Sequence, residues 1–307
     1  ENYMMATIEK IAEVNAIVGE GPIWDIENQR LLWTDIRTGR LFQYDPAVDK
    51  YEQIHDGFFV GGFALNKPGG IAACIWDGIV LWHSDDDWVR IVDESFEGHQ
   101  LRFNDITADP AGRIFGGTMI DDGLGKLYRF DPDGHIEIVE EGVGCSNGMG
   151  YSPDKKTMYY TDSAVRTIYT YDYNLDTGAI SNRKDLIKID DTDGVPDGMT
   201  VDSEGYIWTA VWFSGCVIRI DPDGKEERRI ALPASQTSSL MFGGPDLTDI
   251  YVTTADFNVD PGGPLDPAGY DWEAYKKGYR GGGLFRIRQD IKGMPENKAD
   301  FTWPVKG

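Results

Sequence analysis

The chain of 307 residues has few cysteines and no long apolar run. The odd, widely spaced count of three (Cys74, Cys145 and Cys216) gives no disulfide framework and indicates a reducing compartment. We expect each cysteine to be a small buried hydrophobic residue. No segment approaches the ~20 apolar residues that cross a bilayer, and residues 1–20 lack the apolar core of a signal peptide. We therefore expect a cytoplasmic protein.

Basic residues are also scarce, with 29 Lys and Arg against 52 Asp and Glu, for a formal net charge of −23. Nucleic-acid binding needs a basic face, so the balance argues against a nucleic-acid partner. Anionic membrane surfaces are disfavoured for the same reason. The simplest interpretation of the charge is solubility. A second interpretation is that a few of the carboxylates converge on a cation, and composition does not decide between the two.

The four histidines, His55, His83, His99 and His135, are isolated from one another. None lies within a metal-ligand spacing of another, which disfavours a histidine-based zinc site and a Ser-His-Asp triad. Asp131-Pro132-Asp133-Gly134 lacks the further acids of an EF-hand loop, so we interpret it as a hairpin turn.

Short runs of β-branched and aromatic residues, bounded by Asp, Pro, Gly and Asn, predict strands throughout the chain. These runs repeat, because a threonine ends a strand at intervals of 84, 43, 48 and 44 residues, at Thr34, Thr118, Thr161, Thr209 and Thr253. The first interval spans two units, and the missing member falls near Cys74. Six units of about 40 to 45 residues, each with several strands, predict an all-β fold, a six-bladed β-propeller.

We treat residues 1–307 as one propeller domain. A ring of blades must close, and a strand near residues 6–14 precedes the first full unit, so we expect it to pair into the last blade. The irregular segment at about 256–281 we interpret as a surface excursion, although loops of this length are often functional. The best helix candidate is Asp271 to Lys277.

Four segments in different units carry polar side chains beside strands, and we place them in connections at one end of the ring. They are Gly19-Glu20-Gly21-Pro22, Arg102-Phe103-Asn104-Asp105, Ser146-Asn147-Gly148-Met149 and Pro196-Asp197-Gly198-Met199. Taken alone, each Asn-Gly or Asp-Gly is typical of a turn. Because they recur in register with the repeat, they should point at the same central axis. Carboxylate and amide oxygens suit hard divalent cations, so the pattern predicts a central metal site.

The chain resembles the SMP-30/gluconolactonase family, which includes regucalcin, sugar lactonases and luciferin-regenerating enzyme. The resemblance covers nearly the whole chain. It is carried by GEGPIWD at 19–25, RFNDITADPAGRIFGGTM at 102–119, SNGMGYSPDKKTMYYTDS at 146–163, YDYNLDTGAISNRK at 171–184, PDGMTVDSEGYIWTAVW at 196–212 and FGGPDLTDIYVTTA at 242–255. It implies a six-bladed propeller with one divalent metal in the central channel.

Matching motif to motif, the resemblance implies that Glu20, Asn147 and Asp197 bind the metal, with Asp197 also the general base. Arg102 and Asn104 would hold substrate. The loop 120–126 would correspond to the family's lid, and its Asp121 is a candidate substrate contact. This loop departs from the usual family pattern, which leaves the size of the substrate open. Ca²⁺ is the favoured ion, with Zn²⁺, Mn²⁺, Mg²⁺ and Fe²⁺ as alternatives.

We expect a metal-dependent lactonase that opens a small-molecule sugar lactone to its aldonic acid, acting as a monomer rather than an oligomer. Two alternatives stay open. One is an esterase or phosphotriesterase with the same metal and base. The other is a calcium-binding regulatory propeller without relevant turnover, which the substrate clamp at Arg102 and Asn104 argues against.

Overall fold

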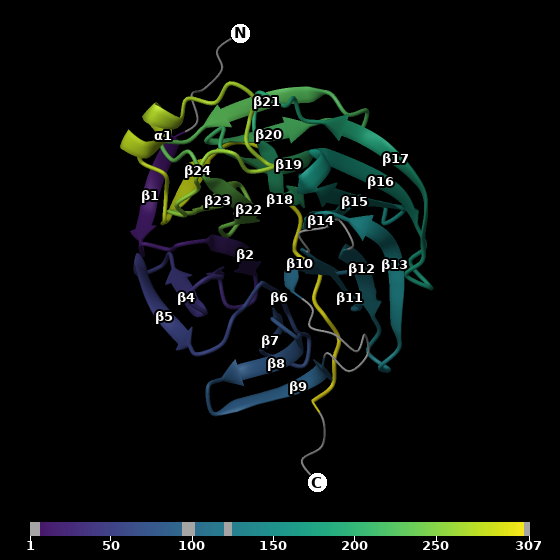
Figure 1. Ribbon diagram of the computed structural model, residues 1–307. Coiled ribbons are helices and arrows are strands. Elements are labelled where there is room, and N and C mark those ends of the chain that lie inside the picture. The colour runs from purple at the N-terminus through teal and green to yellow at the C-terminus, as the bar shows by residue number, and fades with distance from the viewer. Residues whose placement is uncertain (1–6, 94–101, 120–124, 304–307) are drawn as a thin grey trace.

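The computed structural model describes residues 7–93, 102–119 and 125–303, and it forms a six-bladed β-propeller. Six antiparallel sheets of four strands each surround a central axis (Figure 1). The predicted fold class is therefore confirmed. Within each blade the chain runs from the innermost strand outward, except in the last blade, where the N-terminal strand is outermost.

The strands of the first three blades are β2 (Gly19–Asp25), β3 (Arg30–Asp35), β4 (Arg40–Asp45) and β5 (Lys50–Asp56); β6 (Gly62–Leu65), β7 (Ile71–Ile75), β8 (Gly78–Ser84) and β9 (Asp87–Asp93); and β10 (Phe103–Ala108), β11 (Ile114–Thr118), β12 (Gly125–Phe130) and β13 (Ile136–Val143).

The strands of the last three blades are β14 (Ser146–Tyr151), β15 (Thr157–Asp162), β16 (Thr167–Tyr173) and β17 (Ile180–Lys188); β18 (Val195–Val201), β19 (Ile207–Trp212), β20 (Cys216–Ile220) and β21 (Glu226–Ala231); and β22 (Thr237–Gly243), β23 (Asp249–Thr254), β24 (Gly283–Arg288) and β1 (Thr7–Glu13).

The repeated threonines lie in the second strand of five blades, and all five are buried: Thr34, Thr118, Thr161, Thr209 and Thr253. Cys74 occupies β7 of the second blade, where the series lacks its threonine. All three cysteines are free and buried, as expected. The repeated threonines therefore mark a buried position in the second strand of each of these five blades.

The ring closes where β1 pairs with β24 in antiparallel register, Ile8 opposite Ile287. Figure 1 shows this purple N-terminal strand against the last blade. Between the first and last blades, the rings of Trp24 and Tyr251 stack with their centroids 5.7 Å apart. Closure thus joins strands far apart in the sequence, and β1 supplies the outermost strand of the sixth blade.

After β24 the chain crosses one face of the propeller as an extended segment, residues 289–303, which we call the strap (Figure 1). It forms isolated bridges from Gly293 to Asp202 and from Ala299 to Asn66, which follow the C-terminal ends of β18 and β6. The strap therefore covers the end of the axis at which the innermost strands finish. No helix within the described residues is long and apolar enough to cross a membrane.

Candidate functional site

A cavity of about 380 Å³ opens at the opposite end of the axis, where the innermost strands begin. Five of the residues singled out from the sequence line it, from four different blades: Glu20, Arg102, Asn104, Asn147 and Asp197. The sixth, Asp121, lies outside the described residues, as does most of the loop 120–126. All five residues therefore share one cavity, whereas their roles as ligands or substrate contacts stay predictions.

We expected the four motifs to lie in the connections between strands. The structure instead places them in, or directly before, innermost strands. Glu20, Asn147 and Asp197 belong to β2, β14 and β18. The pairing register shifts directly after Glu20 in β2, and Asn147 and Asp197 lie within the corresponding shifts of β14 and β18. The same irregularity follows Phe103 in β10. A β-bulge bends a strand and re-aims its side chains, a device often found beside active sites. It accounts for strand residues that face the axis.

The glycines of Asn147-Gly148 and Asp197-Gly198 serve close packing instead of turns. A Cβ at Gly148 would lie 2.5 Å from the Met199 nitrogen and 2.7 Å from the Asp197 oxygen of the neighbouring blade. A Cβ at Gly198 would collide with Ser239 of the next blade. These glycines let adjacent innermost strands approach closely, which brings Asn147 and Asp197 together.

The two carboxylates, Glu20 and Asp197, are each 8% exposed. Burial raises the pKa of both groups well above the usual range, and the charge of Asp197 adds to the effect on Glu20. Neither carboxylate forms an ion pair within the described part of the chain. Two buried acids without a counter-charge are costly, and a cation between them would offset that cost.

Hydrogen bonds orient the amide of Asn147. Its Nδ2 donates to Ser163 Oγ at 2.9 Å, and Ser163 Oγ donates to the Pro196 oxygen at 2.6 Å. Asn104 Nδ2 donates to the Ser146 oxygen at 2.8 Å and lies 3.4 Å from Asn147 Oδ1. The Asn147 nitrogen is thus held by Ser163, whereas Oδ1 accepts a long hydrogen bond from Asn104 and has a second lone pair for a ligand.

The site is positioned by two buried aspartates, Asp35 and Asp162, which the sequence analysis did not single out. Asp35 accepts hydrogen bonds from Val18 N at 3.0 Å and Ile17 N at 3.2 Å, just before Glu20. Asp162 accepts from Gly144 N and Cys145 N, both at 3.0 Å, just before Asn147. The repeated Thr-Asp at 34–35 and 161–162 was the available signal. Each aspartate fixes the backbone that leads into an innermost strand.

Asp162 also accepts from Ala164 N at 3.1 Å and caps the short 3-10 helix η2 (Ser163–Val165). This turn delivers Ser163 to the side of Asn147. Sequence reasoning missed Ser163, because a serine after a strand carries no signal by itself.

The segment 256–281 forms one wall of the cavity through Phe257, Val259 and residues 263–266. It is anchored by Arg166 Nη2, which donates to the oxygens of Leu265 and Asp266 at 2.9 and 3.0 Å. It also carries the predicted helix, α1 (Trp272–Lys277), capped by Asp271. The interpretation as a plain surface excursion was therefore wrong, since nothing in the sequence says which face a non-repetitive loop will cover.

Arg102 lines the cavity beside Asn104, with its guanidinium 5.7 Å from the Trp76 ring and Nη1 3.2 Å from Met119 Sδ. A planar cation held against an aromatic ring is well suited to carboxyl and hydroxyl oxygens. The side of the cavity formed by Arg102 and Asn104 thus has polar groups for substrate recognition next to an apolar ring.

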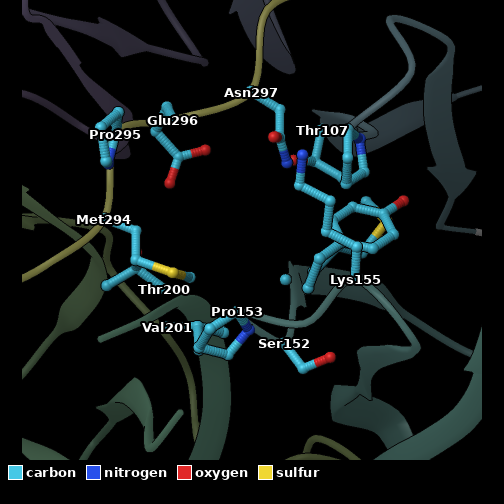
Figure 2. Close-up of a pocket in the computed structure, with 14 residues that line it drawn as sticks. Thr107, Ser152, Pro153, Lys155, Thr200, Val201, Met294, Pro295, Glu296 and Asn297 are labelled. Atoms are coloured by element: carbon cyan, nitrogen blue, oxygen red, sulfur yellow. The ribbon is translucent and has the colours of Figure 1, made fainter. Parts of the chain in front are cut away.

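Two further acids lie on the axis below the cavity. Burial raises the pKa of Asp105 to about 7, and the pKa of Glu296 in the strap is also raised to about 7 by burial. Figure 2 shows the Glu296 carboxylate pointing into a hollow of about 360 Å³ between the strap and the turn that carries Lys155. A smaller cavity of about 40 Å³ is lined by both acids. Sequence reasoning missed Glu296, which lies outside the repeats.

Among the described residues, no three His, Cys, Asp or Glu side chains gather in a metal-binding arrangement. Any cation at this site would therefore depend on amide as well as carboxylate oxygens, a donor set typical of hard divalent ions. The same oxygens are able to bind and orient a polar substrate.

Comparison with known proteins identifies the family. Residues 18–256 match the SMP-30/Gluconolactonase/LRE-like region. The chain is 40% identical over 298 residues to the pentonolactonase XacC of Haloferax volcanii, covering 96% of this chain and 98% of the relative. It is 34% identical over 299 residues to regucalcin of Bos taurus, covering 94% and 96%.

Among solved structures, a luciferin-regenerating enzyme superposes with a TM-score of 0.86 at 30% identity, covering 96% of this chain and 100% of the other. The sequence match extends over most of the chain, and the fold agrees with it. The chain therefore belongs to the SMP-30/gluconolactonase/LRE-like family.

Proposed function

We propose that this protein is a divalent-metal-dependent hydrolase that opens a sugar lactone to its aldonic acid. The observation that carries the proposal is the pair of buried carboxylates, Glu20 and Asp197, in one cavity with Asn104, Asn147 and Arg102. The names of the relatives agree with it, since one is a pentonolactonase and another, from Bacillus subtilis, a sugar lactone lactonase at 36% identity.

The residues fit a divalent cation, with Glu20, Asn147 and Asp197 as its ligands. Both carboxylates have a raised pKa because they are buried, and they have no ionic partner in the described chain. Oxygen donors favour Ca²⁺, with Mg²⁺, Mn²⁺, Zn²⁺ and Fe²⁺ as alternatives. When bound, the ion would polarise the lactone carbonyl and stabilise the oxyanion that develops on it.

The chain's own groups account for the remaining steps. Arg102 donates to hydroxyl or carboxyl oxygens of the substrate, and Asn104 orients it beside Asn147. A carboxylate oxygen of Asp197 accepts a proton from the attacking water. Burial raises the pKa of Asp197 in the metal-free protein, and a bound cation would favour the charged carboxylate, which is the form that accepts the proton. The apolar wall with Phe257 and Val259 limits access of bulk water.

The test is a panel of sugar lactones with metal-stripped protein, read by release of acid in a pH-indicator assay. We expect turnover only after a divalent ion is added back. Asp197→Asn should lower kcat/KM at least about 100-fold, since general base catalysis contributes about 10²–10⁴-fold, while circular dichroism shows an unchanged fold. Asp221→Asn, in an exposed hairpin turn, is the matched control and should retain activity. Full activity in Asp197→Asn would overturn the assignment.

The same panel separates the alternative functions. Faster turnover of phosphotriesters or simple esters than of any lactone would identify an esterase. Stoichiometric Ca²⁺ binding without hydrolysis by any metal form would identify a regulatory propeller, a role compatible with the regucalcin relatives. We further propose that the protein acts as a monomer in the cytoplasm, in keeping with its three free buried cysteines.

A further inference from the structure

Arg37 lines the same cavity and differs from the other charged residues around it. It follows β3 in the first blade, on a turn fixed by hydrogen bonds from Ile36 N to the Val18 oxygen and from Gly39 N to the Asp35 oxygen, both 2.9 Å. Its guanidinium lies 4.9 Å from the centre of the Phe257 ring. Within residues 7–93, 102–119 and 125–303, Arg37 forms no ion pair.

The nearest acid on this turn is already occupied. Asp35 accepts from Arg40 Nη2 at 2.8 Å and from Thr38 Oγ1 at 2.8 Å, in addition to the two backbone nitrogens before Glu20. Two arginines three residues apart therefore have different roles. Arg40 stabilises the turn from outside, whereas Arg37 extends over the cavity with an aromatic ring as its support.

The acids on the facing wall are occupied as well. Asp256 pairs with Arg280 at 2.5 Å, and the Asp266 carboxylate accepts from Gly262 N at 2.6 Å and Gly263 N at 3.1 Å. A chain with a net charge of −23 thus leaves the rim of this cavity with a cation whose charge is not compensated within the described residues. Such a group raises the local concentration of anions at the mouth.

Phe257 holds Arg37 in place because its own backbone is fixed. Phe257 N donates to Gln236 Oε1 at 2.8 Å, and its oxygen accepts from Gln236 Nε2 and from the Tyr275 hydroxyl, both at 2.8 Å. Gln236 and Tyr275 are buried. A guanidinium stacked on a rigid ring loses less conformational entropy when it binds, which favours two-pronged recognition of an anionic group.

We propose that Arg37 is a specificity-determining residue that binds an anionic group, a carboxylate or phosphate, on the lactone at the end away from the reacting carbonyl. Glu20, Asn147 and Asp197 would hold the cation beside the reacting carbonyl, so a group at the far end of the lactone faces the rim, where Arg37 lies. The preferred substrate is then an acidic sugar lactone, that of a sugar diacid or of a phosphorylated sugar. This inference rests on the lactonase function proposed above.

The test compares lactones that differ only in the terminal group. The 1,4-lactone of a hexaric acid carries a carboxylate where that of the corresponding hexonic acid carries a hydroxymethyl group, and a 6-phosphorylated hexonolactone supplies phosphate. We expect kcat/KM to be about tenfold or more higher for one anionic lactone, as for a hydrogen bond to a charged group. Which anionic lactone is preferred decides between carboxylate and phosphate.

Arg37→Met should remove most of this preference by raising KM for the anionic lactone, with the neutral lactone unaffected. Arg37→Lys should retain part of it. Arg30→Met makes the same change in net charge at the other end of β3. It should change kcat/KM for neither the anionic nor the neutral lactone. A wild-type preference for the neutral lactone, or equal losses on both substrates in Arg37→Met, would overturn the inference.

A binding measurement keeps the two proposals apart. If no lactone is hydrolysed, the proposed function fails, and calorimetry with a hexarate and the matching hexonate then decides the role of Arg37. Weaker binding of the hexarate to Arg37→Met than to wild type supports it. Equal affinity of the two proteins for the hexarate rejects it.

Discussion

Ser163 links two blades through a single hydroxyl group. It accepts from Asn147 of the fourth blade and donates to the Pro196 oxygen of the fifth, next to Asp197. The serine is 2% exposed, so neither partner has water as a substitute. At the scale of single residues, the relative position of two proposed ligands depends on a group that would never touch the ion.

Ser163→Ala should leave the Asn147 amide and the Pro196 oxygen each without this partner. We expect metal affinity and kcat/KM to fall about 10–100-fold, as is typical when a group supporting a metal ligand is removed. Calorimetric metal titration and lactone kinetics measure the two effects. Ser152→Ala removes a serine from a turn on the strap side, where its hydroxyl binds Asp154 and backbone nitrogens. This control should lower stability slightly without changing the kinetics, and an equal kinetic loss would refute the positioning role.

At the scale of elements, the innermost strands of the first, fourth and fifth blades share one construction. A polar residue at the start of the strand lies at a bulge, and in β14 and β18 it is followed by a glycine that touches the next blade. The bulge turns the side chain toward the axis, and the glycine sets the distance between strands. Both features belong to the strand and not to a turn, although Asn-Gly and Asp-Gly are turn sequences elsewhere.

Gly148→Ala tests this construction. The added methyl group would meet backbone atoms of Asp197 and Met199, which move only with their strand. We expect a loss of about 1–3 kcal/mol in the free energy of unfolding, the usual cost of overpacking, together with a larger KM and smaller kcat. Urea unfolding and lactone kinetics measure both. Gly57→Ala, where the nearest atom is a side-chain carbon at 3.4 Å, is the control and should be nearly neutral. A Gly148→Ala protein of normal stability and activity would argue against close approach.

At the scale of the whole molecule, the axis is acidic from one end to the other. Glu20 and Asp197 lie at the cavity, Asp105 below them and Glu296 in the strap. The charge of Asp105 contributes to the raised pKa of Glu20, Asp197 and Glu296. Ring closure and the strap concentrate these acids, and the cost in stability depends on pH.

Glu296→Gln measures that cost. Burial, with a smaller contribution from the charge of Asp105, raises the pKa of Glu296 to about 7 in the folded state, above its unfolded value. Its contribution to stability is therefore complete below about pH 4.5 and lost as pH rises through about 7. The glutamine stays neutral, so the free energy of unfolding of the variant should exceed that of wild type by an amount that grows between pH 5 and 8. This difference should reach up to about 3 kcal/mol, since a tenfold change in proton affinity is worth about 1.4 kcal/mol.

Urea unfolding of metal-free protein at several pH values gives the difference directly. Glu52→Gln, on the exposed edge strand β5, controls for the loss of one negative charge. A difference between Glu296→Gln and wild type that is the same at pH 5 and pH 8 would contradict the assignment.

The sequence by itself determined the ring. A repeat of 40 to 45 residues specifies equivalent blades, and equivalent positions converge on one axis. Glu20, Asn147 and Asp197 were therefore expected to face one another, and all three line the cavity. Their role as ligands, assigned through the family resemblance, stays a prediction. The site residue Asp121, outside the described chain, stays a prediction.

Tertiary structure decided what lies outside the repeat. Glu296, Ser163 and the Phe257 wall have no periodic counterpart, so no register locates them. The bulges also escaped the sequence analysis, because a one-residue shift in pairing leaves the pattern of apolar residues readable while turning a side chain to another face. Periodicity specifies where a strand runs, whereas the direction of its polar side chains depends on how neighbouring blades pack against it.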